Sequence, residues 1–457
     1  MDWGGPILTS LDVVMREAAL FAAAGFVVLG AGDLLVDARW LLLRARRGRA
    51  PLPTVADLPT PRRTAPLAIF IPAWDEAAVI ADMLRHAVRA WGEGDYRIYV
   101  GCYPNDPATI AAVRSVADPH ICPVIGATPG PTTKAACLNT LWDALLRDEA
   151  MDGRAAKAVI LHDAEDLVPP EELRIFASAV ERWDFVQLPV RPLIHPGSEW
   201  VGGHYADEFA EAHSKEMPVR EALGAALPSA GVGCAFSREI LAGIAARSGG
   251  HPFDAESLTE DYELGLKVRE LGGTSTFLRI ADADGRIVAT LEYFPGTVST
   301  AVAQKARWMA GIALAGWDRM GWSGGAAERW MRLRDRQSLL AAFLLFAGYF
   351  ALALWLLLAP LRLIAGLEAE PFRPLLFVLI QVNFAFLCWR MSVRAAFTGR
   401  AYGWRQALRS VPRAAVANTV AMLAAAAALS RYRRLRRTGR VTWGKTAHIF
   451  PDPAAAR

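Results

Sequence analysis

Three acids in the segment Leu161-His-Asp-Ala-Glu-Asp-Leu167 form the strongest chemical signal in the sequence. They follow the apolar run of residues 158–161, which is typical of a buried parallel strand. Open α/β sheets bind ligands beyond the carboxyl ends of their strands, so Asp163, Glu165 and Asp166 could together hold a divalent cation through oxygen atoms. A cation at that position would neutralise a diphosphate leaving group. Considered alone, an acidic surface loop explains the segment equally well.

Further acids follow two other apolar runs. Pro72-Ala-Trp-Asp-Glu76 and Tyr103-Pro-Asn-Asp-Pro107 each close a predicted strand. Asp75, Glu76 and Asp106 are therefore placed to hydrogen-bond the base and ribose of a nucleotide. Asp and Asn are also common turn residues after strands, which is the simpler explanation of each motif taken singly.

Lys134 and Asp261 offer charges at the beginnings of two predicted helices. Lys134 ends Gly130-Pro-Thr-Thr-Lys134 and could bring a cation to a phosphate; the glycine spacing is not that of a P-loop. Leu258-Thr-Glu-Asp-Tyr262 reads either as a helix cap or as a site in which Asp261 is a general base for an attacking hydroxyl.

Two further motifs have both a structural and a functional interpretation. Gln304-Lys-Ala-Arg-Trp308 places Gln304, Arg307 and Trp308 on one helix face, which alone favours a membrane-surface helix over a binding site. The flexible segment Ala230-Gly-Val-Gly-Cys-Ala-Phe236 would allow backbone to approach a bound molecule, or would form an ordinary tight turn.

Strands and helices alternate in the middle of the chain, which predicts a parallel sheet with right-handed crossovers. The expected strands are residues 67–71, 96–103, 120–125 and 158–161, and the expected helices are residues 77–91, 109–116, 134–147, 200–215 and 262–271. In the helix 200–215 we expect the cluster of Asp207, Glu208, Glu211 and His213 to be paired, solvated charges rather than ligands.

The remaining sequence is typical of a membrane protein, since 53% of the residues are hydrophobic. The uncharged run 18–32 predicts an anchor rather than a cleaved signal, and the arginines of 39–49 place the following segment in the cytoplasm. Residues 339–364 and 375–389 predict two more spans, and 300–320 an interfacial helix. A span at 411–429 would put the arginines of 431–440 outside, so we expect partial insertion there.

The charge and the cysteine content limit which other classes of protein the sequence could belong to. The net charge is only +4, and the arginine clusters beside apolar segments fit a membrane boundary better than a nucleic-acid surface, so we expect no nucleic-acid partner. The five cysteines show neither disulfide nor metal-ligand spacing, which favours reduced thiols facing the cytosol.

In combination these motifs resemble the membrane-bound processive glycosyltransferase family 2, the group that includes cellulose and hyaluronan synthases. A strand-end acid, a D-x-(D/E) cluster, a G-x-G loop, T-E-D and Q-x-x-R-W occur in that order before apolar spans. The closer resemblance is to membrane glycosyltransferases of the bacteriophage-adsorption protein B (NfrB) type, over roughly residues 65–450. It is carried by Tyr103-Pro-Asn-Asp-Pro-Ala-Thr109, Thr133-Lys-Ala-Ala-Cys-Leu-Asn139, Asp163-Ala-Glu-Asp166, Ala230-Gly-Val-Gly-Cys-Ala-Phe236 and Trp443-Gly-Lys-Thr-Ala-His448.

The resemblance implies a role for each candidate residue. Asp163 and Glu165, with Asp166 beside them, would bind Mg²⁺ or Mn²⁺ and the diphosphate, and the nucleotide sugar would be held by Asp75, Glu76, Asp106 and Lys134. The catalytic base would be Asp261, with Glu260 beside it. The diphosphate and the acceptor would be bound by Gln304, Arg307 and Trp308, and the acceptor-side loop would contain Gly231, Gly233 and Cys234. The sequence departs from the family pattern in having Glu165 as the middle acid and Tyr-Pro-Asn-Asp in place of Asp-Asp-Gly.

The resemblance also implies a domain order and an activity. We expect an N-terminal transmembrane helix with a basic flank (1–50), a proline-rich linker (51–66), a cytoplasmic α/β catalytic domain of GT-A type with a Rossmann-like, mostly parallel sheet (67–298), amphipathic interface helices (299–335), a C-terminal transmembrane region (336–430) and a basic tail (431–457). No regulatory cyclic-dinucleotide domain is expected within this sequence.

The expected activity is that of an inverting hexosyltransferase of the bacterial inner membrane. It would transfer a sugar from a UDP-linked donor to a growing exopolysaccharide that an outer-membrane partner would export. Transfer of one sugar to a lipid carrier is the alternative, and a catalytically silent scaffold or phage-uptake component is a third reading. In each catalytic reading, Asp163, Asp261 and Arg307 must meet in one cleft beside the membrane.

Overall fold

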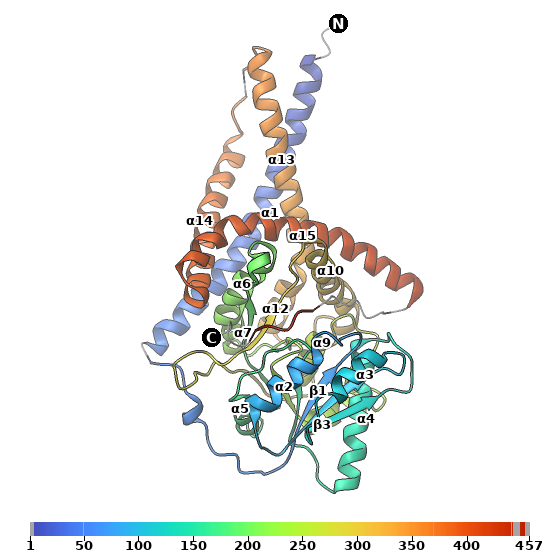
Figure 1. The fold of residues 1–457 in the computed structure, drawn as a ribbon. Coiled ribbons are helices and arrows are strands. Elements are labelled where there is room, and N and C mark those ends of the chain that lie inside the picture. The colour runs from blue at the N-terminus through green and yellow to red at the C-terminus, as the bar shows by residue number, and fades with distance from the viewer. Residues whose placement is uncertain (1–3, 49, 369, 440, 442–447, 453–457) are drawn as a thin grey trace.

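A computed structural model describes residues 4–48, 50–368, 370–439, 441 and 448–452. It contains a lobe built on a β-sheet and a long helical stalk that rises from it (Figure 1). Of the motif Trp443–His448, only His448 lies within the described residues.

The lobe contains one seven-stranded sheet in the order β3-β2-β1-β4-β7-β5-β8. All neighbours are parallel except that β7 is antiparallel to both β4 and β5. The strands are β1 (Leu67–Pro72), β2 (Tyr96–Cys102), β3 (Ile121–Ile125), β4 (Ala158–Leu161), β5 (Phe185–Gln187), β7 (Cys234–Ser237) and β8 (Ser275–Phe277), and a separate parallel pair joins β6 (Val190–Leu193) to β9 (Thr290–Tyr293). This is the mostly parallel GT-A arrangement expected from the sequence, and the four predicted strands are confirmed.

The two faces of the sheet are covered by different helices, because alternate residues of a strand point to opposite sides. In β1, Ile69 and Ile71 pack against α2 (Ile80–Trp91) and its neighbours, whereas Phe70 packs on the other face against α4 (Lys134–Asp152). Both cores are fully closed; Ile69, Phe70 and Ile71 have no solvent exposure. The other helices of the lobe are α3 (Pro107–Arg114), α5 (Glu172–Ala179), α8 (Arg238–Arg247) and α9 (Glu260–Glu270).

Helices α6 (Val201–Glu211) and α7 (Met217–Ala222) connect the lobe to the stalk, with a π-helical segment (Ala212–Glu216) between them. The expectation that their charges are solvated is wrong. Asp207 is completely buried and accepts a hydrogen bond of 2.9 Å from Arg413, which is also completely buried. Buried carboxylates require such partners, because an unpaired charge in a protein interior is costly. The cluster comprises Asp207, Glu208, Glu211 and His213, of which only Glu208 is appreciably exposed.

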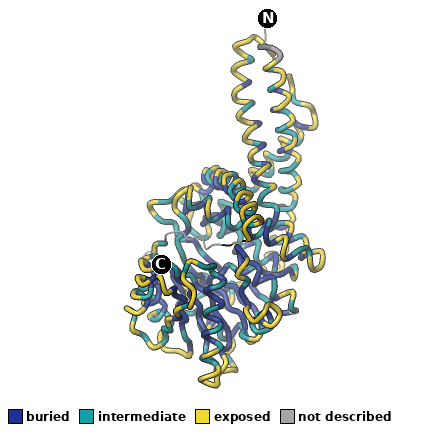
Figure 2. Tube along the Cα trace, turned by 90° about the vertical axis from the view of Figure 1, so that its right-hand side faces the viewer, coloured by how far each residue is buried: buried dark blue, intermediate teal, exposed yellow. Residues whose placement is uncertain are grey.

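Four described helices are long and apolar enough to cross a membrane: α1 (Gly4–Arg47), α13 (Ser338–Ile364), α14 (Pro374–Tyr402) and α15 (Trp404–Thr438). The first three form the stalk, whereas α15 runs across its base, packed on α6 and on α10 (Val298–Met309) (Figure 1). The outer surface of the stalk is largely exposed in the isolated chain (Figure 2), and its exposed side chains include Phe343 and Phe346 of α13. This is the surface expected of helices that face lipid.

Candidate active site

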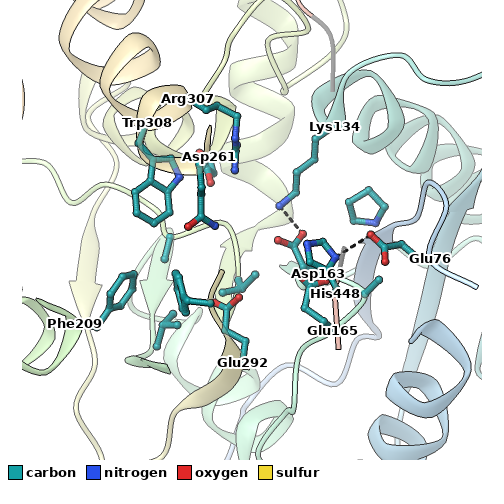
Figure 3. A pocket seen from close by; sticks show the side chains of 17 residues that line it. Glu76, Lys134, Asp163, Glu165, Phe209, Asp261, Glu292, Arg307, Trp308 and His448 are labelled. Atoms are coloured by element: carbon teal, nitrogen blue, oxygen red, sulfur yellow. Dashed lines mark hydrogen bonds and ion pairs between the residues drawn. The ribbon is translucent and has the colours of Figure 1, made fainter. Parts of the chain in front are cut away.

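A cleft opens at the carboxyl ends of the adjacent parallel strands β1 and β4, beneath α10 (Figure 3). Because parallel strands end at the same edge of a sheet, segments far apart in the sequence meet there. The polar residues that line the cleft are Glu76, Lys134, Asp163, Glu165, Asp261, Glu292, Gln304, Arg307 and His448.

Asp163 and Glu165 leave β4 on the loop that forms the floor of the cleft. The Lys134 ammonium, at the first residue of α4, lies 2.5 Å from Asp163 Oδ1. Burial by itself would lower the pKa of Lys134, but the carboxylates of Asp163, Glu260 and Asp261 raise it, so this lysine stays charged. Burial raises the pKa of Glu165 to about 8. Carboxylates concentrated in this way favour a cationic ligand.

Glu76 and His448 form the other side of this floor. Glu76 follows β1, and His448 belongs to a C-terminal segment that returns to the lobe from α15. His448 Nδ1 lies 3.0 Å from Glu76 Oε1 and 3.2 Å from Glu165 Oε2. Burial alone would lower the pKa of His448, but the two carboxylates raise it.

Asp261 enters the cleft from the first turn of α9. Its Oδ1 accepts a hydrogen bond of 2.7 Å from the Tyr262 amide, while Oδ2 lies beside Gly231. Gly231 has a φ of +79°, and a Cβ at this position would stand 2.5 Å from Asp261 Oδ2. A glycine is thus required here both by the left-handed backbone and by the space that the carboxylate occupies. Burial raises the pKa of the neighbouring Glu260 to about 7.

The helix α10 carries Arg307 and Trp308 to the upper side of the cleft (Figure 3), and Gln304 of the same helix also lines the cleft. The helix continues into a π-helical turn (Ala310–Ala315), in which a Cβ on Gly311 would lie 2.5 Å from the side chain of Thr259. This close approach seats α10 directly over the segment that precedes Asp261. Gln304 Oε1 is buried and has no hydrogen-bond partner among the described residues. A bound molecule with a hydroxyl donor would satisfy it.

Several predicted site residues lie outside the residues that line the cleft. Asp166 is completely buried and accepts hydrogen bonds from the amide of Asp163 (3.0 Å) and from Nδ1 of His162 (2.8 Å). Asp106 caps α3 and accepts a 2.6 Å hydrogen bond from the amide of Asp75, which is exposed and has a φ of +54°. Asp166 and Asp106 therefore hold the loops that present their neighbours.

The loop before β7 is also divided in its roles. Ala230 and Val232 line the cleft, and Gly231 makes room for Asp261. Gly233 instead packs against Thr290, and Cys234 is completely buried in the sheet core.

Four cleft residues with charged or aromatic side chains were absent from the sequence-predicted set. Glu292 comes from β9, Phe209 from α6, Phe294 follows β9, and His448 was noted only as part of a motif. Burial raises the pKa of Glu292 well above its ordinary value, with the acids of the floor contributing. The pairing of β9 with β6 and the antiparallel bridge between Leu291 and Leu167 bring Glu292 to the cleft.

Comparison with known proteins gives the same family as the motifs. The family model described as glycosyltransferase like family 2 matches residues 64–311. Bacteriophage adsorption protein B of Escherichia coli (strain K12) and bacteriophage N4 adsorption protein B of Escherichia coli O157:H7 are each 35% identical to the chain over 481 aligned residues. The alignment covers 99% of this chain and 64% of each relative, so the chain spans less than two thirds of their length.

Solved structures show a more distant likeness. The mannosyltransferase PcManGT from Pyrobaculum calidifontis, in complex with GDP-Man and Mn²⁺, is 16% identical over 88% of this chain and 98% of that one, with a TM-score of 0.49. Glucosyl-3-phosphoglycerate synthase from Mycobacterium tuberculosis, in complex with Mn²⁺ and UDP-glucose, is 14% identical over 61% of this chain and 86% of that one, with a TM-score of 0.35.

Proposed function

The chain belongs to glycosyltransferase family 2, and from this premise we propose that it transfers a sugar from a nucleotide-sugar donor to an acceptor hydroxyl at the cytoplasmic face of a bacterial inner membrane. The single observation that carries this proposal is the convergence of Asp163, Asp261 and Arg307 on one cleft beneath α10. A silent scaffold would have no need to keep this set together.

Asp261 is the proposed general base. It takes the proton of the acceptor hydroxyl while the hydroxyl oxygen attacks the anomeric carbon and the bond from that carbon to the diphosphate breaks. A single displacement of this kind inverts the anomeric centre and requires no covalent enzyme intermediate. The side chain suits the role because it is half-buried and one of its oxygens faces the cleft beside Gly231.

The departing nucleoside diphosphate carries negative charge, which the cleft is built to receive. Lys134 and Arg307 both line it (Figure 3). Asp163 and Glu165 provide the oxygen donors that Mg²⁺ or Mn²⁺ binds, and such a cation would neutralise the diphosphate. The buried carboxylate of Glu165, whose pKa is raised, fits a partner of positive charge.

The acceptor side of the cleft is aromatic. Trp308 of α10, Phe209 and Phe294 line it, and the Trp308 ring meets Phe294 edge to face at 6.4 Å between centroids. Aromatic faces of this size suit the apolar face of a sugar ring. Since Val420 of α15 packs in one cluster with Phe294 and Trp308, we propose a growing exopolysaccharide as the acceptor, with a UDP-linked sugar as donor and a separate export partner beyond the membrane.

The decisive experiment measures donor-dependent nucleoside diphosphate release by the full chain in membranes, across a panel of nucleotide sugars. Asp261→Asn should lower the rate by about 10²–10⁴-fold, while Asp284→Asn, which changes an acid whose side chain is 70% exposed, should not. Release that is absent for every donor, or unchanged in Asp261→Asn, would refute the proposal. The length of the product distinguishes synthesis of a polysaccharide from transfer to a lipid carrier. A product that is extended by a single sugar indicates transfer to a lipid carrier.

A further inference from the structure

The helix that carries Asp261 begins without a side-chain cap. Thr259 stands at the N-cap of α9, yet its side chain makes no hydrogen bond to the first turn. Its buried Oγ1 has no hydrogen-bond partner among the described residues. The first N–H groups of a helix have no partner within the helix, and uncapped ends fray. The position of Asp261 therefore depends on contacts with other elements.

Tyr262, the residue after Asp261, makes such a contact. Its amide donates a hydrogen bond of 2.7 Å to Asp261 Oδ1, and its hydroxyl donates one of 2.6 Å to Asp335 Oδ2. The tyrosine is buried in a small apolar cluster, with an exposed fraction of 7%. One residue thus connects the carboxylate in the cleft to a second carboxylate on α12 (Ala326–Arg336).

Asp335 is itself held in place by Arg220 of α7. Arg220 Nη1 donates to both carboxylate oxygens of Asp335, at 2.8 and 2.9 Å, and the arginine side chain is 5% exposed. Hydrogen bonds between two charged groups are about twice as strong as neutral ones. Asp335 is therefore a fixed acceptor for the Tyr262 hydroxyl rather than a mobile surface acid.

Two further ion pairs join α9 to the same part of the chain. Arg319 of α11 (Gly316–Met320) donates from Nε to Glu263 Oε2 at 3.1 Å. Arg332 of α12 donates from Nη2 to Glu270 Oε1 at 3.0 Å. Because one acid lies in the first turn of α9 and the other is its last residue, the helix is tied along its whole length to α11 and α12.

The helix α12 is continuous with the stalk. Only Gln337 separates it from α13. Arg334 of α12 pairs with Asp33 of α1 at 3.0 Å, and Met331 packs in one buried cluster with Val36 of α1. Through α12, two helices of the stalk are joined to the turn that carries the proposed base.

We propose that Tyr262 is a positioning residue for the reaction, and that Asp335 fixes the place of Asp261 through it. This role rests on the proposed function, because Asp261 is taken as the base. A displacement of α12 relative to the sheet would move the first turn of α9, and the carboxylate with it. The donor contacts of Lys134 and Asp163 come from α4 and the loop after β4, so they do not pass through α9.

The kinetic test compares Tyr262→Phe with the wild type, using the full chain in membranes and the donor that gives the fastest nucleoside diphosphate release. Phenylalanine keeps the buried ring and removes only the hydroxyl, and the thermal unfolding midpoint checks the fold. We expect the turnover number to fall about 10-fold or more, since a misplacement of about 1 Å can cost 10²-fold, with the KM for the donor unchanged. Asp335→Asn should also lower turnover, and the double variant should be no slower than the slower single variant, because both changes act through one hydrogen bond.

Hydrogen exchange tests the anchor without sugar transfer. In Tyr262→Phe the amides of residues 258–264 should exchange faster than in the wild type, because the first turn of α9 opens more often. Tyr432→Phe is the matched control. The Tyr432 hydroxyl donates to Asp318 Oδ2 at 2.5 Å at the surface, and neither residue lines the cleft. This variant should leave both turnover and the exchange of residues 258–264 unchanged.

The proposal would be overturned by unchanged turnover or unchanged exchange in Tyr262→Phe, by an equal loss in Tyr432→Phe, or by losses that multiply in the double variant. A KM that rises in step with the loss of turnover would also overturn it. Release that depends on Asp261 but not on Tyr262 would refute the positioning role alone. Absence of release from every donor would instead refute the proposed function, and the positioning role with it.

Discussion

Gly231→Ala tests the geometry of the proposed base without changing any chemical group of the cleft. A Cβ at Gly231 would stand 2.5 Å from Asp261 Oδ2, about 0.9 Å short of the 3.4 Å at which ordinary contact begins. Asp261 must therefore move by nearly that distance. Because displacing a reacting group by about 1 Å can cost 10²-fold, we expect the turnover number to fall about 100-fold. The KM for the donor should change little, since Lys134 and Arg307 are not displaced.

The substitution also strains the backbone, and this effect needs its own control. A residue with a Cβ costs about 1–2 kcal/mol in the left-handed region. Gly224→Ala carries the same cost, because its φ is +68°, but a Cβ there would meet no atom within 4 Å. The thermal unfolding midpoint should thus fall in Gly224→Ala by the backbone cost alone, and in Gly231→Ala by at least that amount.

The assay is nucleoside diphosphate release with the preferred donor, measured for both variants with their unfolding midpoints. Only Gly231→Ala should lose turnover. The reasoning would be refuted if Gly231→Ala transferred sugar at nearly the wild-type rate, because the base would then lie elsewhere. Equal losses in both variants would refute it too, because backbone strain alone would explain the result.

Three further predictions concern the donor side, the pH dependence and the membrane arrangement. Lys134→Met removes the partner of Asp163 and should raise the KM for the donor about 10-fold or more, as the loss of a charge-assisted contact implies; Lys134→Arg should retain most affinity. Burial raises the pKa of Glu260 to about 7. Between pH of about 4.5 and 7, the folded state therefore binds a proton that the unfolded state has released, and the stability of the wild type should fall as pH rises through this range. Glu260→Gln should therefore raise the unfolding midpoint more at pH 8 than at pH 5. The third prediction is that α15 lies along the membrane surface. Single cysteines at Tyr402 and Thr438, each in a cysteine-free chain, should then react with an impermeant maleimide from the same side of the membrane. Labelling from opposite sides would contradict this arrangement.

The fold could be predicted from sequence where the signal is local. Strand β4 begins and ends where its apolar run does, and β1 and β2 differ from their predicted ends by one residue. Helix lengths near the membrane were underestimated for a physical reason. The apolar run 18–32 lies within the much longer α1, whose charged flanks remain helical because Asp12 pairs with Arg362 and Asp33 with Arg334. Those partners lie more than three hundred residues away and no local window contains them.

The same limit explains the buried charges of α6. A helix with acids spaced by one turn is usually a solvated surface, and nothing within residues 200–215 indicates otherwise. Asp207 is buried because Arg413 of α15 reaches it across the base of the stalk. The information that distinguishes a solvated acid from a buried one therefore lies in another element.

The candidate site could likewise be predicted from the sequence only in part. Acids that follow parallel strands could be placed at one edge of the sheet from sequence, and Glu76, Asp163 and Glu165 do lie together there. Spacing could not separate them from Asp106 and Asp166, which follow equivalent strands but turn back to bind backbone amides. An acid's role at a strand end depends on which way its loop turns, and this depends on hydrogen bonds that a one-dimensional pattern does not contain.

His448 is the strongest case of this dependence. Its identity as a histidine carries little weight in sequence, since most histidines in such a chain are structural. Its position matters because Phe450 supplies an anchor two residues later, and because Glu76 and Glu165 already face each other where the segment docks. A segment that follows α15 and places His448 beside the ends of the first and fourth strands links the packing of the helical stalk to the assembly of the cleft. Loosening the anchor with Phe450→Ala should consequently lower the rate of nucleoside diphosphate release even though every polar residue of the cleft is retained.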